Sequence, residues 1–113
     1  MSRRRRALAE AYAAPLFAAL GDGTRLQLVG RLATGGPASI SALSAEAEVS
    51  RQAISKHLEV LARAGLVHGA RVGREHVWEL APERLEEART YLDGVAAQWD
   101  EALDRLRRLV EDE

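Results

Sequence analysis

The chain has 113 residues, a formal net charge of −1 and no cysteine. This length suits one domain with a modest core. The absence of cysteine excludes disulfides, thiolate metal sites and a cysteine nucleophile. No apolar run approaches the roughly 18 residues that span a bilayer. The opening MSRRRR leads into an amphipathic stretch and not into the apolar core of a signal peptide. We therefore expect a single domain over residues 1–113, located in the cytoplasm and not in a membrane.

The small net charge conceals an uneven distribution. Residues 1–80 carry 11 basic and 7 acidic side chains, whereas residues 81–113 carry 5 and 10. This division indicates that residues 1–80 bind a polyanion and that residues 81–113 have a different function. The alternative is that both parts only present solvated faces.

The first element is predicted to be a helix. Leu8, Tyr12, Leu16 and Leu20 recur at four-residue spacing, which is typical of a helical stripe. Pro15 should kink this helix or divide it in two. Residues 1–6, with their four arginines, are expected to form a basic, flexible arm.

A second helix is expected after the break at GDGTR, where Asp22 or Thr24 can cap it. It should end at the glycine pair 35–36. Its apolar residues are Leu26, Leu28, Val29 and Leu32.

Residues 39–64 contain two further predicted helices. SISALSAEAEV favours a short one with Ile40, Leu43 and Ala47 turned inward. Ser50 is placed to cap the next, VSRQAISKHLEVLARAGLV, which stops at Gly65. Its inner face holds Ile54, Leu58, Leu61 and Ala62, and its first turns hold the polar, non-acidic residues Ser50, Arg51, Gln52, Ser55, Lys56 and His57.

Residues 66–80 change to a strand-like pattern. The runs Leu66–Val72 and Glu75–Leu80 predict a hairpin around a turn at Gly73-Arg74. In that register, residues 71 and 76 pair, so His68 and His76 project from opposite faces.

Pro82 then opens a long last helix, residues 82–110. Its apolar residues recur every three and four positions: Leu85, Ala88, Leu92, Val95, Trp99, Ala102 or Leu103, Leu106 and Val110. This seam is longer than a small domain can cover alone, so we expect a partner helix in a two-fold dimer. The alternative is that it folds back on Leu8, Tyr12 and Leu16 of its own chain.

The order helix, short helix, turn, helix, hairpin is that of a winged helix-turn-helix, a mostly α fold with a β-hairpin wing. In this motif the second helix enters the major groove of DNA with its N-terminal residues leading. A polar, non-acidic first turn matches the donors and acceptors of base edges and the charge of the phosphates.

Three stretches in order, LGDGTRLQLVGRLA, VSRQAISKHLEVLARAGLV and VGREHVWEL, resemble the ArsR-type (arsenic-repressor-like) family of winged helix-turn-helix transcriptional regulators. The resemblance covers about residues 15–110, with Gly23 where the family usually has proline. It implies a homodimeric repressor of its own or a neighbouring operon. Such a repressor binds a palindromic operator in double-stranded DNA and leaves it when an effector binds.

Carried over residue by residue, the resemblance assigns DNA binding to Ser50, Arg51, Gln52, Ser55, Lys56, His57, Arg71 and Arg74. Arg51 and Gln52 are expected to contact bases, since long forked side chains make bidentate contacts. The residues expected at phosphates are Ser50, Ser55 and His57, while Lys56 suits either role. A second interpretation of His57 is a half-buried residue that bridges helices. Arg71 and Arg74 would lie on the wing, or they are only exposed hairpin charge.

The resemblance also implies that the first and last helices of two chains pack together. The predicted interface residues are Leu8, Tyr12, Leu16, Leu92, Val95, Trp99, Leu103 and Leu106. Trp99 would be the largest buried anchor.

Many family members sense metals through cysteines, or through Asp, His and Glu sets in the last helix. This chain has neither pattern, so it resembles a metal-independent branch, and we expect no metal site and no cofactor. A small-molecule effector, a protein partner or no effector remain open. No catalytic constellation or phosphate-binding loop is present, so we expect no enzyme. The alternative function is a protein–protein interaction module or antitoxin-like partner, which the polar face of residues 51–56 disfavours.

Overall fold

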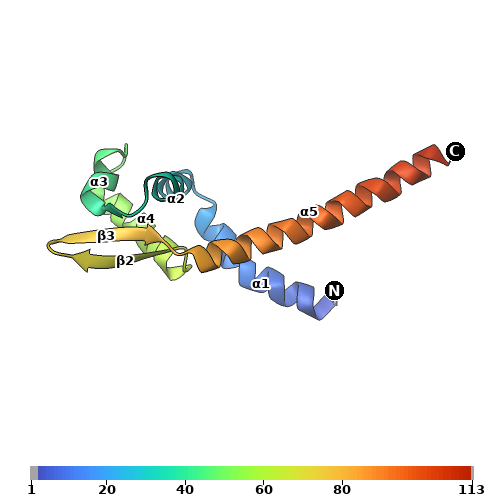
Figure 1. Cartoon of the computed structure of the whole chain (residues 1–113), viewed down its shortest axis with the longest axis horizontal. Helices are drawn as coiled ribbons and strands as arrows, with labels where there is room; N and C mark the ends of the chain where they lie inside the picture. Colours follow the sequence, from blue (N-terminus) through green and yellow to red (C-terminus); the bar gives the residue numbers. More distant parts are fainter. Residues whose placement is uncertain (1–2, 113) are drawn as a thin grey trace.

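The computed structural model describes residues 3–112, with side chains except at residues 6–9. Its principal extents are 68 × 28 × 20 Å. In chain order the elements are α1 (Arg3–Leu20), α2 (Gly23–Gly35), β1 (Ala38–Ser39), α3 (Ile40–Ala45), α4 (Arg51–Arg63), β2 (Val67–Val72), β3 (Glu75–Leu80) and α5 (Pro82–Glu111). The β2–β3 hairpin and the C-terminal end of α5 lie at opposite ends of the long axis (Figure 1).

Short polar side chains define where three of the helices begin. Asp22, Ser39 and Ser50 each accept a hydrogen bond from the backbone N–H three residues further on, at 3.0, 3.1 and 3.1 Å. These bonds satisfy amide groups that a helix cannot pair internally. Asp22 is therefore the cap of α2, and the prediction of Ser50 as the cap of α4 is confirmed.

Helix α1 differs from its prediction in two respects. It continues through Pro15 and is not divided there. A proline removes one helical hydrogen bond, but Ala13 and Leu16 on either side are buried against the body, which holds both turns in place. Residues 3–6, expected to form an arm, are helical and make up the first turn of α1, since arginine favours helix. Residues 1–2 lie outside the described part of the chain.

The hairpin has the predicted register. Arg71 pairs with His76 and Val72 with Glu75, leaving Gly73 and Arg74 as the two-residue turn. Gly73 has a φ of 63°, a conformation that favours glycine. The sheet order is β1-β3-β2, because Ala38 in β1 pairs with β3. This strand was not predicted: its two residues are too few to show an alternating pattern.

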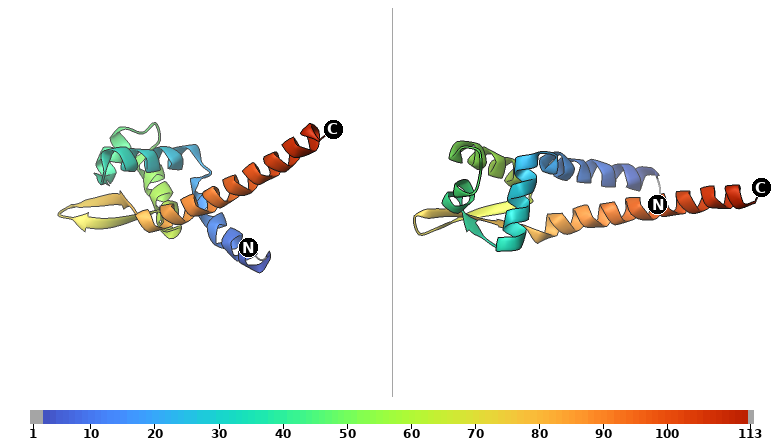
Figure 2. Two further views of the ribbon diagram at one scale, coloured as in Figure 1. Left: turned by 45° about the vertical axis from the view of Figure 1, so that its right-hand side comes forward. Right: turned by 90° about the horizontal axis from the view of Figure 1, so that it is seen from above.

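One apolar cluster joins the elements. It contains most of the inner residues predicted for the helix-turn-helix, while Ala47 and Ala62 are only partly buried against it. Its largest members are Leu16, Leu28, Leu32, Ile40, Leu43, Ile54, Leu58, Leu61, Leu66, Val67 and Trp78. Among the described side chains of α5, Ala88 alone is buried. Most of this helix therefore extends beyond the body that the cluster holds together (Figure 2).

Candidate nucleic-acid interface

Helix α4 is two-sided. Ile54, Leu58 and Leu61 are at most 1% exposed and pack into the core. The opposite side of the first two turns carries Arg51, Gln52 and Lys56, all exposed, with Ser55 half-buried between the two faces. Anchoring the apolar side fixes the orientation of the polar side, so these side chains project together from one rigid element.

Ser50 lies at the N-terminus of α4 and is exposed. Its Oγ atom accepts the cap hydrogen bond, and the hydroxyl proton remains able to donate. The unpaired N–H groups and the dipole at a helix N-terminus attract anions. Ser50 is thus both a cap and a polar group beside Arg51.

His57 occupies a different environment from its neighbours in α4. Its side chain is 24% exposed, and Nδ1 lies 3.2 Å from Nη1 of Arg25 and 3.8 Å from Oδ2 of Asp22. A guanidinium has only donors, so Nδ1 is the acceptor in a hydrogen bond between the two side chains. This geometry favours the second interpretation of His57, a residue that joins α4 to α2.

The contacts of Arg25 with Ala19 and His57 were not predicted from the sequence. Its Nε atom donates to the carbonyl oxygen of Ala19 at the end of α1, while Nη1 meets His57. The hydrogen bond from the Arg25 backbone N–H, aided by the positive charge of Arg25, lowers the pKa of the Asp22 carboxyl below its usual 3.8. Asp22, Arg25 and His57 thereby connect three helices.

The wing carries the other two predicted DNA contacts. Arg71 in β2 and Arg74 in the turn are both exposed. Across the hairpin, His76 stacks on Trp78 with ring centroids 4.5 Å apart. A Cβ at Gly69 would lie 2.4 Å from Nε2 of His76, so the missing side chain leaves room for this stack. Trp78 is 6% exposed and anchors the hairpin to the core.

Arg84, also missed from sequence, ties α5 to the end of α4. Its Nε atom donates to the carbonyl oxygen of Ala64 at 3.3 Å, and Nη1 pairs with Glu87 at 2.7 Å. The guanidinium carbon lies 4.4 Å from the ring centroid of Tyr12 in α1. No periodicity marks its contacts with Ala64 and Tyr12, because these residues are 20 and 72 positions away.

Most of the residues predicted for a dimer interface are exposed in the single chain. Their exposed fractions range from 44% for Val95 to 67% for Trp99, the others being Tyr12, Leu92, Leu103 and Leu106. Leu16 requires a correction: it is fully buried in the core of its own chain, so it is not an exposed interface residue. The side chain of Leu8 lies outside the described part.

No group of three or more possible metal ligands occurs among the described residues. The pairing of β2 with β3 places His68 and His76 on opposite faces, because residues 68 and 79 pair and residues 71 and 76 pair. Within residues 3–112, no helix is long and apolar enough to cross a bilayer.

A helix-turn-helix with a polar, non-acidic tip, followed by a hairpin that exposes Arg71 and Arg74 near its turn, defines a winged helix-turn-helix DNA-binding protein. A helix-turn-helix domain model matches residues 20–70. The chain is 41% identical to the HTH-type transcriptional regulator Rv2034 of Mycobacterium tuberculosis over 95 aligned residues. The aligned region covers 84% of this chain and 85% of Rv2034. The chain belongs to the ArsR-type family of winged helix-turn-helix regulators, and it is a DNA-binding transcriptional regulator.

Solved structures agree with this assignment. An ArsR-like transcriptional regulator from Rhodococcus sp. RHA1 has 36% sequence identity and a TM-score of 0.74 over 88% of this chain and 92% of that one. The homodimeric winged helix-turn-helix DNA-binding domain Mb0332 of Mycobacterium bovis, a possible ArsR-family regulator, has 30% identity and a TM-score of 0.65 over 87% and 88%. Family membership favours DNA binding over the alternative of a module used only for protein contact.

Proposed function

We propose that the chain is a homodimeric repressor that binds a palindromic operator at its own or a neighbouring operon. The observation that carries this proposal is the outer face of α4, where Arg51, Gln52 and Lys56 are exposed above a fully buried apolar side. In a helix-turn-helix this is the face that enters the major groove.

Arg51 and Gln52 read bases in this proposal. Arginine forms bidentate hydrogen bonds to guanine and glutamine to adenine. Ser50 and Ser55 donate to phosphates, and Lys56 contacts either a base or a phosphate. On the wing, Arg71 and Arg74 lie over the backbone or the minor groove, where positive charge is favoured.

The homodimer rests on the seam of α5 and on Tyr12 of α1. Their large apolar side chains are unusual on a monomer surface and are spaced for a helical partner. The structurally similar Mb0332 domain is described as homodimeric. A dimer would present two α4 helices to two DNA half-sites about 34–36 Å apart. Because both half-sites are bound at once, the dimer binds DNA more tightly than one subunit does.

Release from DNA is proposed to depend on an effector other than a metal ion. The chain has no cysteine, and its three histidines are divided between α4 and the two faces of the hairpin. A small organic molecule therefore suits this chain better than a thiophilic or imidazole-bound metal.

The direct test is binding of the purified protein to the DNA upstream of its own gene and to a scrambled duplex, across a salt series. A specific reader is expected to prefer the upstream DNA by about a thousandfold or more, with affinity falling steeply as salt rises. Equal, weak binding to both duplexes would contradict an operator at this position. Loss of repression of a reporter on deleting the gene tests the sign of regulation.

A further inference from the structure

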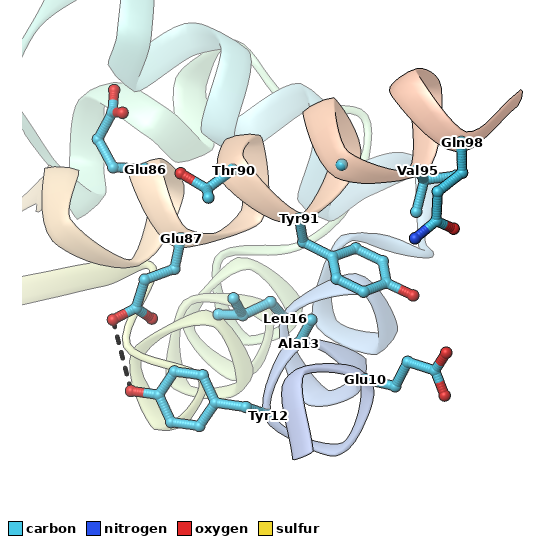
Figure 3. A pocket seen from close by; sticks show the side chains of 11 residues that line it. Glu10, Tyr12, Ala13, Leu16, Glu86, Glu87, Thr90, Tyr91, Val95 and Gln98 are labelled. Carbon is cyan, nitrogen blue, oxygen red and sulfur yellow. Dashed lines mark hydrogen bonds between the residues drawn. The ribbon is translucent and has the colours of Figure 1, made fainter. Parts of the chain in front are cut away.

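A cavity of about 470 Å³ lies between α1 and α5, a size that suits a small organic molecule. Its floor is formed by Ala13 and Leu16 of α1, and both side chains are buried. Tyr12 and Tyr91 lie on either side of this floor (Figure 3). Gly94 also lines the cavity, and a Cβ at that position would meet nothing within 4 Å. The space therefore stays open on the α5 side.

The face of α5 that lines the cavity differs from its apolar seam. Successive residues of a helix point about 100° apart, so Gly94 in the lining and Trp99 on the seam, five positions apart, differ by about 140°. The same spacing separates Glu87 of the lining from Leu92 of the seam. Val95 is the one seam residue among the described lining. A partner helix packed along the seam would therefore leave most of the cavity free.

The lining of the cavity is acidic. Three carboxylates contribute to it: Glu10, Glu86 and Glu87. None of the described lining residues is basic. Glu87 and Glu86 have basic neighbours on α5, Arg84 at 2.7 Å and Arg89 at 3.7 Å. No basic side chain in the described part of the chain pairs with Glu10. The cavity thus retains negative charge, which favours a cation.

An aromatic ring of the lining already binds a cation of the chain itself. The guanidinium carbon of Arg84 lies 4.4 Å from the ring centroid of Tyr12. Aromatic rings attract ammonium groups in the same way. Glu10, the Tyr91 hydroxyl and Gln98 lie toward the other end of the cavity (Figure 3). An ammonium group at that end would meet a carboxylate and two neutral polar groups, while an apolar body covers the floor.

We propose that the α1–α5 cavity binds an amphipathic organic cation, an apolar molecule that carries one ammonium group, and that this molecule releases the chain from DNA. The proposal rests on the effector-controlled repressor proposed above and specifies the chemical class and the place of its effector. A carboxylate of the same shape would bring a second negative charge beside Glu10, which is unfavourable.

The floor of the cavity is connected to the recognition helix. Leu16 belongs to the apolar cluster that also contains Leu58 of α4. At the end of α1, the carbonyl oxygen of Ala19 accepts a hydrogen bond from Arg25, and Arg25 contacts His57 of α4. A molecule inserted between α1 and α5 would shift α1, and both contacts would transmit this shift to α4.

The test uses the full chain and three molecules of one shape but different charge: phenylbutylamine, phenylbutanol and phenylbutyrate. Calorimetry measures their affinities. We expect the amine to bind with a Kd of about 1 mM or tighter, and at least about 10-fold more tightly than the carboxylate. Glu10→Gln keeps the size of the side chain but removes its charge, so it should reduce this preference by about threefold or more. Glu111→Gln, at the far end of α5, is the matched control and should keep the preference.

A second pair of variants tests the place of binding. Gly94→Leu fills the cavity and is expected to weaken binding of all three molecules by about 10-fold or more. Gly30→Leu is the matched control, since a Cβ at Gly30 also meets nothing within 4 Å but lies on α2. Leucine favours helix over glycine, so neither variant should lose folding, and their melting temperatures check this.

Release from DNA has a separate readout. Saturating phenylbutylamine is expected to weaken binding of the wild type to the upstream DNA by about 5-fold or more. The same loss is expected in Gly30→Leu, and none in Gly94→Leu. This comparison removes the general effect of an added cation on contacts between protein and DNA.

Three results would overturn the binding site: equal affinity for the amine and the carboxylate, unchanged binding in Gly94→Leu, or no binding of any of the three molecules at about 10 mM. Amine binding that leaves DNA affinity unchanged would overturn the effector role. In each case, specific binding to the upstream DNA would leave the DNA-binding regulator intact. A chain that binds the amine but has no preference for the upstream DNA would contradict the proposed repressor, and the effector role with it, but not the site.

Discussion

The Nδ1 atom of His57 in the recognition helix α4 lies 3.2 Å from the Nη1 atom of Arg25 in α2. His57 follows Lys56 directly, yet Lys56 is exposed and His57 faces inward at 24% exposure. Neighbouring residues on one helix are about 100° apart, so a single position separates a side chain that can meet DNA from one that supports the helix.

His57→Ala is therefore expected to lower the free energy of unfolding by about 1 kcal/mol, the usual effect of losing a part-buried hydrogen bond. Lys56→Ala should change it by less than about 0.5 kcal/mol, because its side chain is exposed. For DNA affinity the order should be reversed, with Lys56→Ala the more damaging. Urea unfolding measures the stability of both variants, and DNA titration measures their affinity. A larger loss of DNA affinity in His57→Ala than in Lys56→Ala would assign His57 to the DNA interface.

Asp22 predicts how stability depends on pH. The Arg25 backbone hydrogen bond holds the pKa of this carboxyl below its usual 3.8. Because the pKa is lowered in the folded state, the stabilisation is fully present above the unfolded-state value and is lost as pH falls through the folded-state value. Asp22→Asn keeps a side chain that can cap α2 but removes the charge.

The melting temperature of the wild type should thus exceed that of Asp22→Asn at about pH 7, and the difference should shrink below about pH 3.8. Thermal unfolding of both proteins across this range is the measurement. A difference that stays constant down to about pH 2 would mean that the ionised carboxyl has no special role.

Replacing Arg84 is expected to lower the stability of the fold, although this residue is not on the outer face of α4. Its replacement by alanine removes a hydrogen bond to Ala64, an ion pair with Glu87 and the contact with the Tyr12 ring. We expect the free energy of unfolding to fall by about 1–2 kcal/mol. Arg89→Ala is the control, because its pairing with Glu86 is 73% and 68% exposed and should contribute less than about 0.5 kcal/mol. Equal losses in the two variants would refute a special role for Arg84.

The wing predicts an effect on salt dependence. If Arg74 contacts the DNA backbone, Arg74→Ala should weaken binding to upstream and scrambled duplexes alike and reduce the slope of log K against log salt by about one. Arg63→Ala, at the other end of α4, should leave the slope unchanged. An unaltered slope in Arg74→Ala would mean that this arginine is only exposed hairpin charge.

Local signals in the sequence were sufficient to predict most of the architecture. The caps Asp22 and Ser50, the turn at Gly73 and the inner face of α4 each follow from a pattern within a few residues. β1 was not predicted, because its pairing with β3 spans about forty positions and its two residues show no period.

The candidate site was predicted less completely, for two physical reasons. Arg25 and Arg84 act through contacts to residues 32 and 20 positions away, which no local spacing encodes. Tyr12 and Leu16 belong to one helical stripe, yet Tyr12 is 57% exposed and Leu16 is fully buried. The helical spacing predicts that both side chains pack against apolar residues. It does not tell whether those residues belong to the same chain or to another chain.

The central claim is that the exposed tip of α4 reads base pairs, and the double variant Arg51→Ala, Gln52→Ala tests it most directly. Each side chain is expected to contribute about 1–3 kcal/mol of discrimination. The double variant should therefore bind the upstream DNA at least about 30-fold more weakly while its melting temperature and oligomeric state stay those of the wild type. Binding as tight as that of the wild type, with the same preference over a scrambled duplex, would contradict the account.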